Sequence, residues 1–325
     1  MHQSLRHILL LAPVCLCLAC TGGRGPELPG DPLLGTEISF DTAVVSFDED
    51  PEYGTPDTKL DLKFYNGSYS WENGDKIKIV QYSLESGSDA SSEYSYNSSS
   101  WNSSSPLRWQ STGAHDFYAV YPATAPVSFD DPSLSYSDKA AVISVEIPRN
   151  QNNSNLAANY AMAGTYHADN PEPQMSFRMY PLLTVLRFVF VNRTGTSLRI
   201  APTQLVGWDE TSWPSTQLYL YGKYQVKTEA SEPSSYWSKS LNSSLAGFSE
   251  TPAYRSLVLN AASTVSNYGS WGCQFYVVPN DYRRFVLTVN FTKGTNPVQS
   301  KQITYTSSGN VFDPYKIHYL YLTVY

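Results

Sequence analysis

Apolar and polar residues alternate along many short stretches of the chain, and a period of two predicts β-strands. Gly and Pro separate these stretches, and an amphipathic helical period is almost absent. The pattern therefore predicts an all-β protein. Outside the middle of the chain, we expect strands at 37–47, 60–65, 76–82, 116–122, 141–148, 217–222, 255–260, 273–279, 284–292, 301–306 and 315–325.

Two stretches do not follow this period. Residues 83–105 are rich in Ser and Asn, a composition that is typical of a long exposed loop. Residues 155–164 are rich in Ala, and we expect them to form a short helix or a turn.

The most apolar stretch lies near the middle of the chain, at 175–200. Leu186, Phe188 and Phe190 alternate there with a second apolar set, so both faces of this strand should be covered. We expect a turn at 192–197 to return the chain as a hairpin.

The length of 325 residues is sufficient for two domains. We place the boundary at the start of the apolar stretch, because short strands with turn residues between them precede and follow it. The prediction is a first β-sandwich domain at 36–174 and a second at 175–325.

The N-terminus predicts export. One basic residue precedes an apolar stretch, 8–19, that is too short to cross a bilayer and has the length of a signal-peptide core. We therefore predict a lipoprotein signal peptide at 1–19 and a flexible tether at 20–35. The junction resembles a bacterial lipobox, in which Cys20 becomes the lipidated first residue, although Cys17 stands where Leu is usual. An ordinary secretory peptide cleaved nearby is the alternative.

Charge and cysteine usage narrow the function classes. The formal net charge is -7 and no cluster of Lys and Arg is present, which argues against a nucleic-acid partner. With Cys20 acylated, the folded body would hold no disulfide. We expect Cys273 to be a buried apolar residue rather than a nucleophile.

A search for catalytic motifs finds no zinc-protease, hydrolase or phosphate-binding pattern. His115, His167 and His318 are far apart and have no metal-ligand spacing. The acidic run at 48–52 lacks the full pattern of a calcium loop, and a solvated loop is the simpler interpretation. We predict that the protein is not an enzyme and that it has no catalytic residue, metal or cofactor.

Tryptophans in polar surroundings leave a second function open. Trp208 and Trp213 flank two carboxylates, and Trp101 lies in the Ser-rich tract. Exposed tryptophans near carboxylates can hold sugar rings, but a core or interface role is favoured for all three.

Several elements, taken in order, resemble the fimbrillin family of Bacteroidetes, which comprises the type V pilins and their Mfa-like relatives. The resemblance extends from about residue 36 to the end of the chain. It is clearest for W-x-x-G-D-K-I and for F-x-x-x-x-x-L-x-x-L-x-F, both of which are structural landmarks. The elements are the lipobox, "ISF" (38–40), "WENGDKIKI" (71–79), "DFYAVYP" (116–122), "IP" (147–148), "YAMAG" (160–164) and "MSFRMYPLLTVLRFVF" (175–190).

The resemblance implies a particular fold and assembly. Such subunits are exported as lipoproteins with two transthyretin-like β-sandwich domains, and an arginine-specific protease removes the first strand. A donor strand from the C-terminus of another subunit then fills the groove. The candidate replaced strand carries Ile38, Phe40, Val44 and Val45, and the candidate donor strand carries Ile317, Tyr319, Leu320, Tyr321 and Leu322. An ordinary last strand, paired within its own domain, is the alternative for the second set.

The sequence departs from this pattern at one point. The loop expected after the first strand, 48–59, contains Lys59 but no Arg. Arg24 precedes the strand, so a cut there would release the lipid and leave the strand in place. The chain is therefore either a pilus subunit cut by another protease, or an anchor or accessory subunit, or a surface lipoprotein that does not polymerise.

We predict a fimbrillin-like lipoprotein of the outer membrane and cell surface that assembles into a fimbrium by donor-strand complementation and serves adhesion. The expected partners are other pilin subunits or further copies of this chain, the outer membrane through a lipid anchor, and a host or glycan ligand. The alternative is a monomeric surface glycan-binding lipoprotein.

Overall fold

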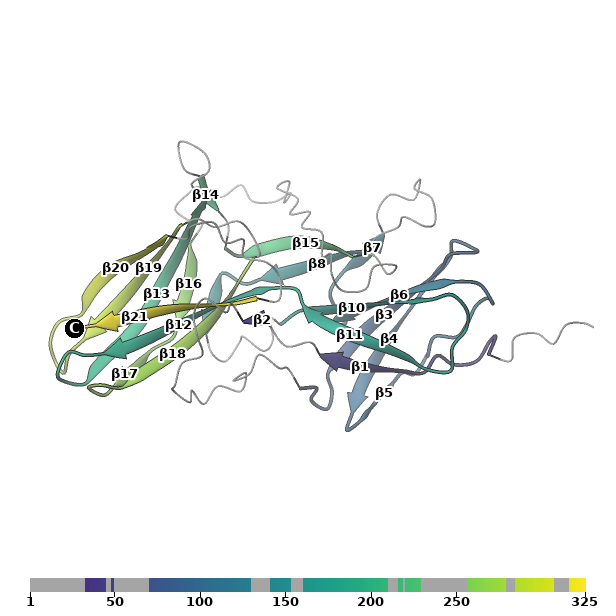
Figure 1. Ribbon diagram of the computed structural model, residues 1–325, viewed down its shortest axis with the longest axis horizontal. Coiled ribbons are helices and arrows are strands. Elements are labelled where there is room, and N and C mark those ends of the chain that lie inside the picture. The colour runs from purple at the N-terminus through teal and green to yellow at the C-terminus, as the bar shows by residue number, and fades with distance from the viewer. Residues whose placement is uncertain are drawn as a thin grey trace, which may run out of the picture. The chain divides into compact units, whose positions relative to one another are not determined.

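In the computed structural model, the described part of the chain is built from β-strands (Figure 1). By its internal contacts the chain divides into Met1–Pro32 and Leu33–Tyr325, and every described residue lies in the second unit. Each regular element in the described part is a β-strand, which confirms the all-β prediction. The described residues are 33–44, 48–49, 70–129, 141–152, 160–209, 216–218, 220–228, 256–278, 284–306 and 316–325.

A seven-stranded sheet and a three-stranded sheet are built mainly from the first half of the chain. The large sheet has the order β1-β11-β10-β6-β3-β4-β5 and the small one the order β15-β8-β7. The strands of the large sheet are β1 (Phe40–Val44), β3 (Lys76–Ser83), β4 (Asp89–Asn97), β5 (Ser100–Asn102), β6 (His115–Tyr121), β10 (Met162–Ala168) and β11 (Met175–Pro181). Those of the small sheet are β7 (Val127–Phe129), β8 (Ala141–Ile147) and β15 (Gly222–Thr228).

Alternation along β3 gives the large sheet two buried faces. Val80 and Tyr82 pack with Tyr118 of β6 and with Ala141 of the small sheet. The ring of Phe129 in β7 lies 5.1 Å from that of Tyr82. The opposite face of β3, which carries Ile77 and Ile79, belongs to the main core.

The other two sheets are built mainly from the second half. One has the order β18-β12-β21-β2, and the other the order β20-β19-β13-β16-β9 with β14 and β17 also paired to β13. The first contains β2 (Asp48–Glu49), β12 (Thr184–Asn192), β18 (Ser270–Val277) and β21 (Lys316–Val324). The second contains β9 (Asn150–Asn152), β13 (Leu198–Asp209), β14 (Thr216–Leu218), β16 (Leu257–Asn260), β17 (Ser263–Val265), β19 (Arg284–Thr292) and β20 (Gln299–Thr306).

Strand β12 is the most enclosed strand in its sheet. It pairs antiparallel with β18 on one side and parallel with β21 on the other. Leu186, Phe188 and Phe190 on one face are buried, as are Val185 and Val189 on the other. The prediction that both faces are covered is confirmed.

The predicted hairpin at 192–197 is wrong. The turn leads from β12 into β13, but β13 pairs with β19 and lies in a different sheet. Both edges of β12 are already occupied by β18 and β21, so the following strand has no edge on which to return.

The Ser- and Asn-rich tract is also not a long exposed loop. Residues within 83–105 form β4 and β5, and β4 pairs with β3 over seven positions. The inward residue Tyr94 is 2% exposed and its hydroxyl accepts a hydrogen bond from the backbone N–H of Leu107 at 2.8 Å. Tyr94 and Tyr96 lie two positions apart and so follow the period of a strand, but the Ser-rich composition around them suggested a loop.

The expected helix or turn at 155–164 is a strand over its last part, because β10 begins at Met162. Residues 153–159 and the expected strand at 60–65 lie outside the described residues.

Two strands pair with a partner from the other half of the sequence. β15 follows β13 and β14 along the chain but pairs with β8, and β9 follows β8 but pairs in parallel with β16. The chain passes from the seven-stranded sheet that contains β1 to the four-stranded sheet between β11 and β12. The division into domains at 36–174 and 175–325 stays a prediction.

A glutamine on β9 caps the outer edge of β18. The side chain of Gln151 is fully buried, donates from Nε2 to the carbonyl of Tyr276 at 2.8 Å, and accepts from the backbone N–H of Tyr276 at 2.8 Å. One amide thus takes the place of a neighbouring strand at this position.

An ion pair joins the adjacent strands β6 and β10. His167 Nδ1 lies 2.6 Å from Asp116 Oδ1. Burial lowers the pKa of His167, but the hydrogen bonds and charges of Asp116 and Asp169 together outweigh burial and leave the pKa raised. The pKa of Asp116 is also raised, and the cause there is its burial.

Replacement of Gln151 by Met should lower the free energy of unfolding by roughly 2–4 kcal/mol, because it leaves two buried backbone groups of Tyr276 without partners. The measurement is urea unfolding followed by tryptophan fluorescence. Gln302→Met, at an exposed position of β20, is the matched control and should change stability by less than about 0.5 kcal/mol. Equal effects of the two substitutions would contradict the capping role.

Stability should also depend on pH through His167. Because its pKa is higher in the folded chain, its contribution is complete below the unfolded value of about 6.5 and is lost as pH rises through the folded value. The stability difference between the wild type and His167→Gln should therefore shrink as pH rises from 6 to about 8. A difference that grows over this range in thermal unfolding would contradict the assignment.

Candidate functional site

The N-terminal segment closes the large sheet of the first half. Its backbone pairs first with residues 107–109: the N–H of Gly35 donates to Trp109 at 3.0 Å, and the N–H of Ile38 donates to Leu107 at 2.9 Å. It then continues as β1, which pairs in parallel with β11 from Phe40↔Met175 to Val44↔Met179. We call the place between residues 107–109, β5 and β11 the β1 slot.

The side chains that fill the β1 slot alternate along the segment. Ile38 is 3% exposed, and Phe40 and Val44 are half-buried against the same core. The ring of Phe40 lies 4.8 Å from that of Tyr94 and 5.7 Å from that of Phe177. Full burial of one such side chain stabilises the fold by about 1.5–3 kcal/mol, so an empty slot would be costly.

The two edges of this sheet meet through side chains. Strand β5, at the opposite edge from β1, lies in contact with it. The indole N–H of Trp101 donates to the hydroxyl of Thr42 at 3.1 Å, and its ring lies 6.5 Å from that of Phe40 at an angle of 25°. The sheet is therefore curled, and the N-terminal segment closes it.

Three of the four residues predicted for a replaceable first strand are described, and their replacement by another strand stays a prediction. Ile38, Phe40 and Val44 point into the β1 slot, and Val45 lies outside the described residues. Within the described residues, β1 begins at Phe40 rather than at residue 37, and residues 45–47 of the predicted strand lie outside the described residues.

The chain beyond β1 contributes to a second sheet. β2 pairs in parallel with the start of β21, with Asp48↔Lys316 and Glu49↔Ile317 in register. Among the described residues, none pairs with this side of β21 beyond Ile317. The segment from Gly35 to Glu49 thus supplies an edge strand to one sheet in each half of the fold (Figure 1).

The predicted donor strand lies within its own sheet. β21 pairs with β12 over eight positions, and the yellow β21 runs beside the teal β12 in Figure 1. Ile317, Tyr319 and Leu320 are buried, Leu322 is half-buried, and Tyr321 is 41% exposed. This is the arrangement of an ordinary last strand, and a donor role for these residues stays a prediction.

A polar row fixes β21 to its neighbours. The guanidinium of Arg187 on β12 donates to the hydroxyl of Tyr319 at 3.1 Å and to the amide oxygen of Gln274 at 2.8 Å. All three side chains are at most 5% exposed and occupy one row across β21, β12 and β18. Removal of β21 would break this row and leave a buried charge short of partners.

The described residues carry no metal centre. No group of three or more His, Cys, Asp or Glu side chains in the described ranges could hold a metal ion. Cys273 is a buried thiol, and this burial raises its pKa. Burial also lowers the pKa of His115. The predicted lipidation residue Cys20 lies outside the described residues.

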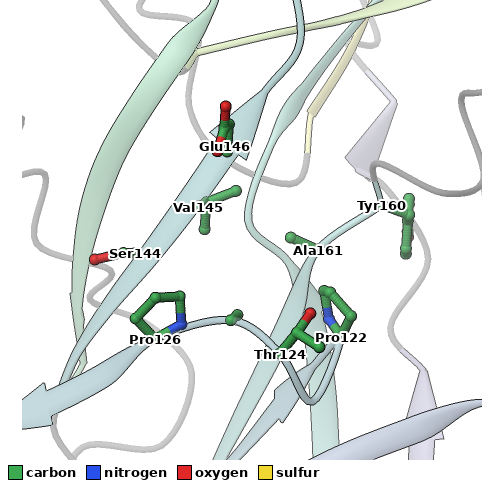
Figure 2. Close-up of a pocket in the computed structure, with 9 residues that line it drawn as sticks. Pro122, Thr124, Pro126, Ser144, Val145, Glu146, Tyr160 and Ala161 are labelled. Carbon is green, nitrogen blue, oxygen red and sulfur yellow. The ribbon is translucent and has the colours of Figure 1, made fainter.

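The pocket drawn in Figure 2 has little chemistry. It has a volume of about 190 Å³ and lies between the turn at Pro122–Pro126 and the end of β8. Its one charged residue, Glu146, lies 3.8 Å from the amine of Lys223. An exposed carboxylate that already faces a cation gives no convergent set of groups for a ligand.

The tryptophans considered for sugar binding are engaged in packing where the structure describes them. Trp101 lies 4.9 Å, ring to ring, from Trp71 and 5.2 Å from Tyr96. The guanidinium of Arg284 lies 4.6 Å from the ring of Trp208. Trp213 lies outside the described residues.

The contacts of Trp101 and of residues 107–109 are the part of the site that sequence reasoning missed. Trp101 and Thr42 are 59 positions apart, and no local pattern joins them. The alternation of Tyr94 and Tyr96 was the available signal, and it lay inside a tract whose composition suggested a loop.

The described residues include no helix with the length and apolarity to span a membrane.

The sequence matches the Fimbrillin-like family over residues 64–319. Similar solved structures include candidate cell adhesion proteins from Bacteroides ovatus (10% identity, TM-score 0.49, 89% of this chain and 92% of that one) and Bacteroides fragilis (13%, 0.47, 88% and 92%). A fimbrial protein from Bacteroides vulgatus is also similar (13%, 0.42, 88% and 95%). No curated protein matches the sequence. Because the family match covers most of the chain, the protein belongs to the fimbrillin-like family.

Proposed function

We propose that this protein is a fimbrial subunit of the cell surface, with a role in adhesion, that accepts a strand from another subunit in the β1 slot. The observation that carries the proposal is the position of residues 35–44. They lie at a sheet edge, are joined to the rest of the fold by strand pairing and alternate side chains, and precede every other described strand.

The position of β1 at a sheet edge allows strand exchange. A segment at a sheet edge can leave without breaking pairing between the strands that stay, whereas a central strand cannot. Its departure would expose the N–H and C=O groups of β11 and the apolar core surface that Ile38 and Phe40 now cover. An extended strand with apolar side chains at alternate positions would satisfy both.

The C-terminal strand supports an accepting rather than a donating role. β21 is paired with β12 along its length and is fixed by the Arg187 row. To donate it, the chain would have to give up the burial of Ile317 and Leu320 and these hydrogen bonds. An accessory subunit that receives a strand and keeps its own last strand fits these costs.

Export as a lipoprotein completes the proposal. The apolar stretch before Cys20 has the length of a signal-peptide core, and acyl chains on Cys20 would hold the precursor on the outer membrane. Removal of residues up to the end of β1 would then release the lipid and open the β1 slot in one step. Because no Arg occurs at 48–59, the proposal requires a protease without arginine specificity, or one that cuts after Lys59.

Strand uptake can be measured directly. Residues 52–58 are replaced by the recognition sequence of a site-specific protease, and the folded protein is cut and mixed with a fluorescent peptide of residues 34–49. We expect the labelled peptide to enter the β1 slot as the cut segment leaves, because both carry the same side chains. Size-exclusion chromatography with fluorescence detection follows the exchange.

The control peptide carries Phe40→Asp and Val44→Asp, which places charges where the slot is apolar. It should enter at least tenfold more weakly, because an unpaired buried charge is costly. Equal uptake of the two peptides, or retention of the cut segment against an excess of the first, would contradict the proposal.

A further inference from the structure

The β1 slot combines contacts that accept many sequences with one that does not. The backbone of β11 and of residues 107–109 pairs with any extended segment. Tyr94 and Phe177 present aromatic rings to Phe40, and such contacts tolerate many apolar side chains. The indole N–H of Trp101 is different, because it is a directional donor that needs an acceptor.

Neighbouring rings hold Trp101 in place. Trp71 packs edge-on against it at a centroid distance of 4.9 Å, and Tyr96 lies opposite it in the β4–β5 pairing with its ring 5.2 Å away. The indole N–H therefore points at one position of the slot before any strand arrives, and a strand without an acceptor there would leave it unsatisfied.

We propose that Trp101 is the specificity-determining residue of the β1 slot. It selects a strand with an aromatic side chain at the position of Phe40 and a hydroxyl two residues later, at the position of Thr42. The proposal rests on the function proposed above, in which another strand replaces β1. The partner is an extended segment of another fimbrial subunit with the pattern aromatic-x-Ser/Thr-x-aliphatic, which β1 itself shows as Phe40, Thr42 and Val44.

The spacing of the two requirements follows from strand geometry. Residues two apart on a strand share a face and lie about 6.8 Å apart, so one indole can contact both. Its ring face covers Phe40 while its N–H reaches Thr42. Asp41, between them, points away and is exposed, so the selection does not involve that position.

The first test uses the intact chain and hydrogen exchange of residues 40–44, read by mass spectrometry of peptic peptides. Trp101→Phe retains an aromatic ring and removes the donor, and Thr42→Val removes the acceptor at nearly constant volume. Each should raise the exchange rate of this segment by roughly two- to tenfold. The double variant should exchange no faster than the faster single variant, because both substitutions remove the same bond.

Controls separate this effect from general loosening. Thr42→Ser keeps the hydroxyl and should restore slow exchange, and Tyr96→Phe keeps its ring and should leave residues 40–44 unchanged. Exchange of β12 should be the same in every variant, since its partners do not change. Additive effects of the two single substitutions, or no effect of Trp101→Phe, would overturn the proposal.

The second test measures selection with the cut protein described above. The peptide of residues 34–49 should bind roughly two- to tenfold more tightly than the same peptide with Thr42→Val. That preference should disappear when the protein carries Trp101→Phe. A preference that persists without the indole N–H would overturn the role of Trp101.

The two proposals fail in different ways. If no peptide enters the cut protein, strand replacement is wrong, and with it the selection of an incoming strand. Coupling between Trp101 and Thr42 in the intact chain would still show that the bond retains β1. If the peptides enter without any preference at Thr42, strand replacement stands and the selective role of Trp101 is overturned.

Discussion

The structure depends on the closure of one curled sheet by a segment at the start of the described chain. Strand β11 has one edge occupied by β10, and its other edge is satisfied by β1 alone among the described strands. Residues 35–38 likewise supply backbone hydrogen-bond partners to residues 107–109. Without the segment, backbone groups at both places would lose their partners and the space around Ile38 would open. The core of the first half is thus completed by residues that belong to its edge.

This constraint gives the two ends of the chain unequal roles. The N-terminal segment is peripheral in both sheets that it joins, at β11 and at β21. The C-terminal strand β21 pairs with β12 over eight positions and with β2 only at its first two residues, and the charge of Arg187 is buried against it. An edge strand such as β1 can be exchanged while the remaining pairs stay intact, whereas the loss of β21 would also leave the buried charge of Arg187 short of partners. Under the proposed function, these costs favour exchange of the N-terminal segment over donation of the C-terminal strand.

Much of the architecture is visible in the period of the sequence, because strands buried on at least one face alternate. That is why β3, β6, β19 and β21 could be predicted close to their bounds, and why the apolar sets of β12 indicated two covered faces. Which strands pair is a different matter, since it depends on the edges left free by strands distant in sequence. The turn at 192–197 looks local but joins two sheets, because β18 and β21 already flank β12.

The same reason limits what could be predicted of the site. The alternation of Ile38, Phe40 and Val44 indicated a strand that buries one face. The partner of that face could not be found, because Trp101 lies in a Ser- and Asn-rich tract whose composition is typical of a loop. The tract folds as β4 and β5 because Tyr94 and Trp101 can reach a core that the N-terminal segment completes. Composition describes a segment by itself, whereas this segment is ordered by contact with another one.

The central claim is that residues up to β1 leave the protein when it is assembled at the surface. The most direct measurement is the N-terminus of the protein taken from fimbriae on its own cells, determined by mass spectrometry of the intact chain and of its N-terminal peptide. The account predicts a chain that begins between about residue 45 and residue 60, with no acyl group. An acylated Cys20 at the start of an uncut chain in assembled fimbriae would contradict it, because β1 would then still occupy its own slot.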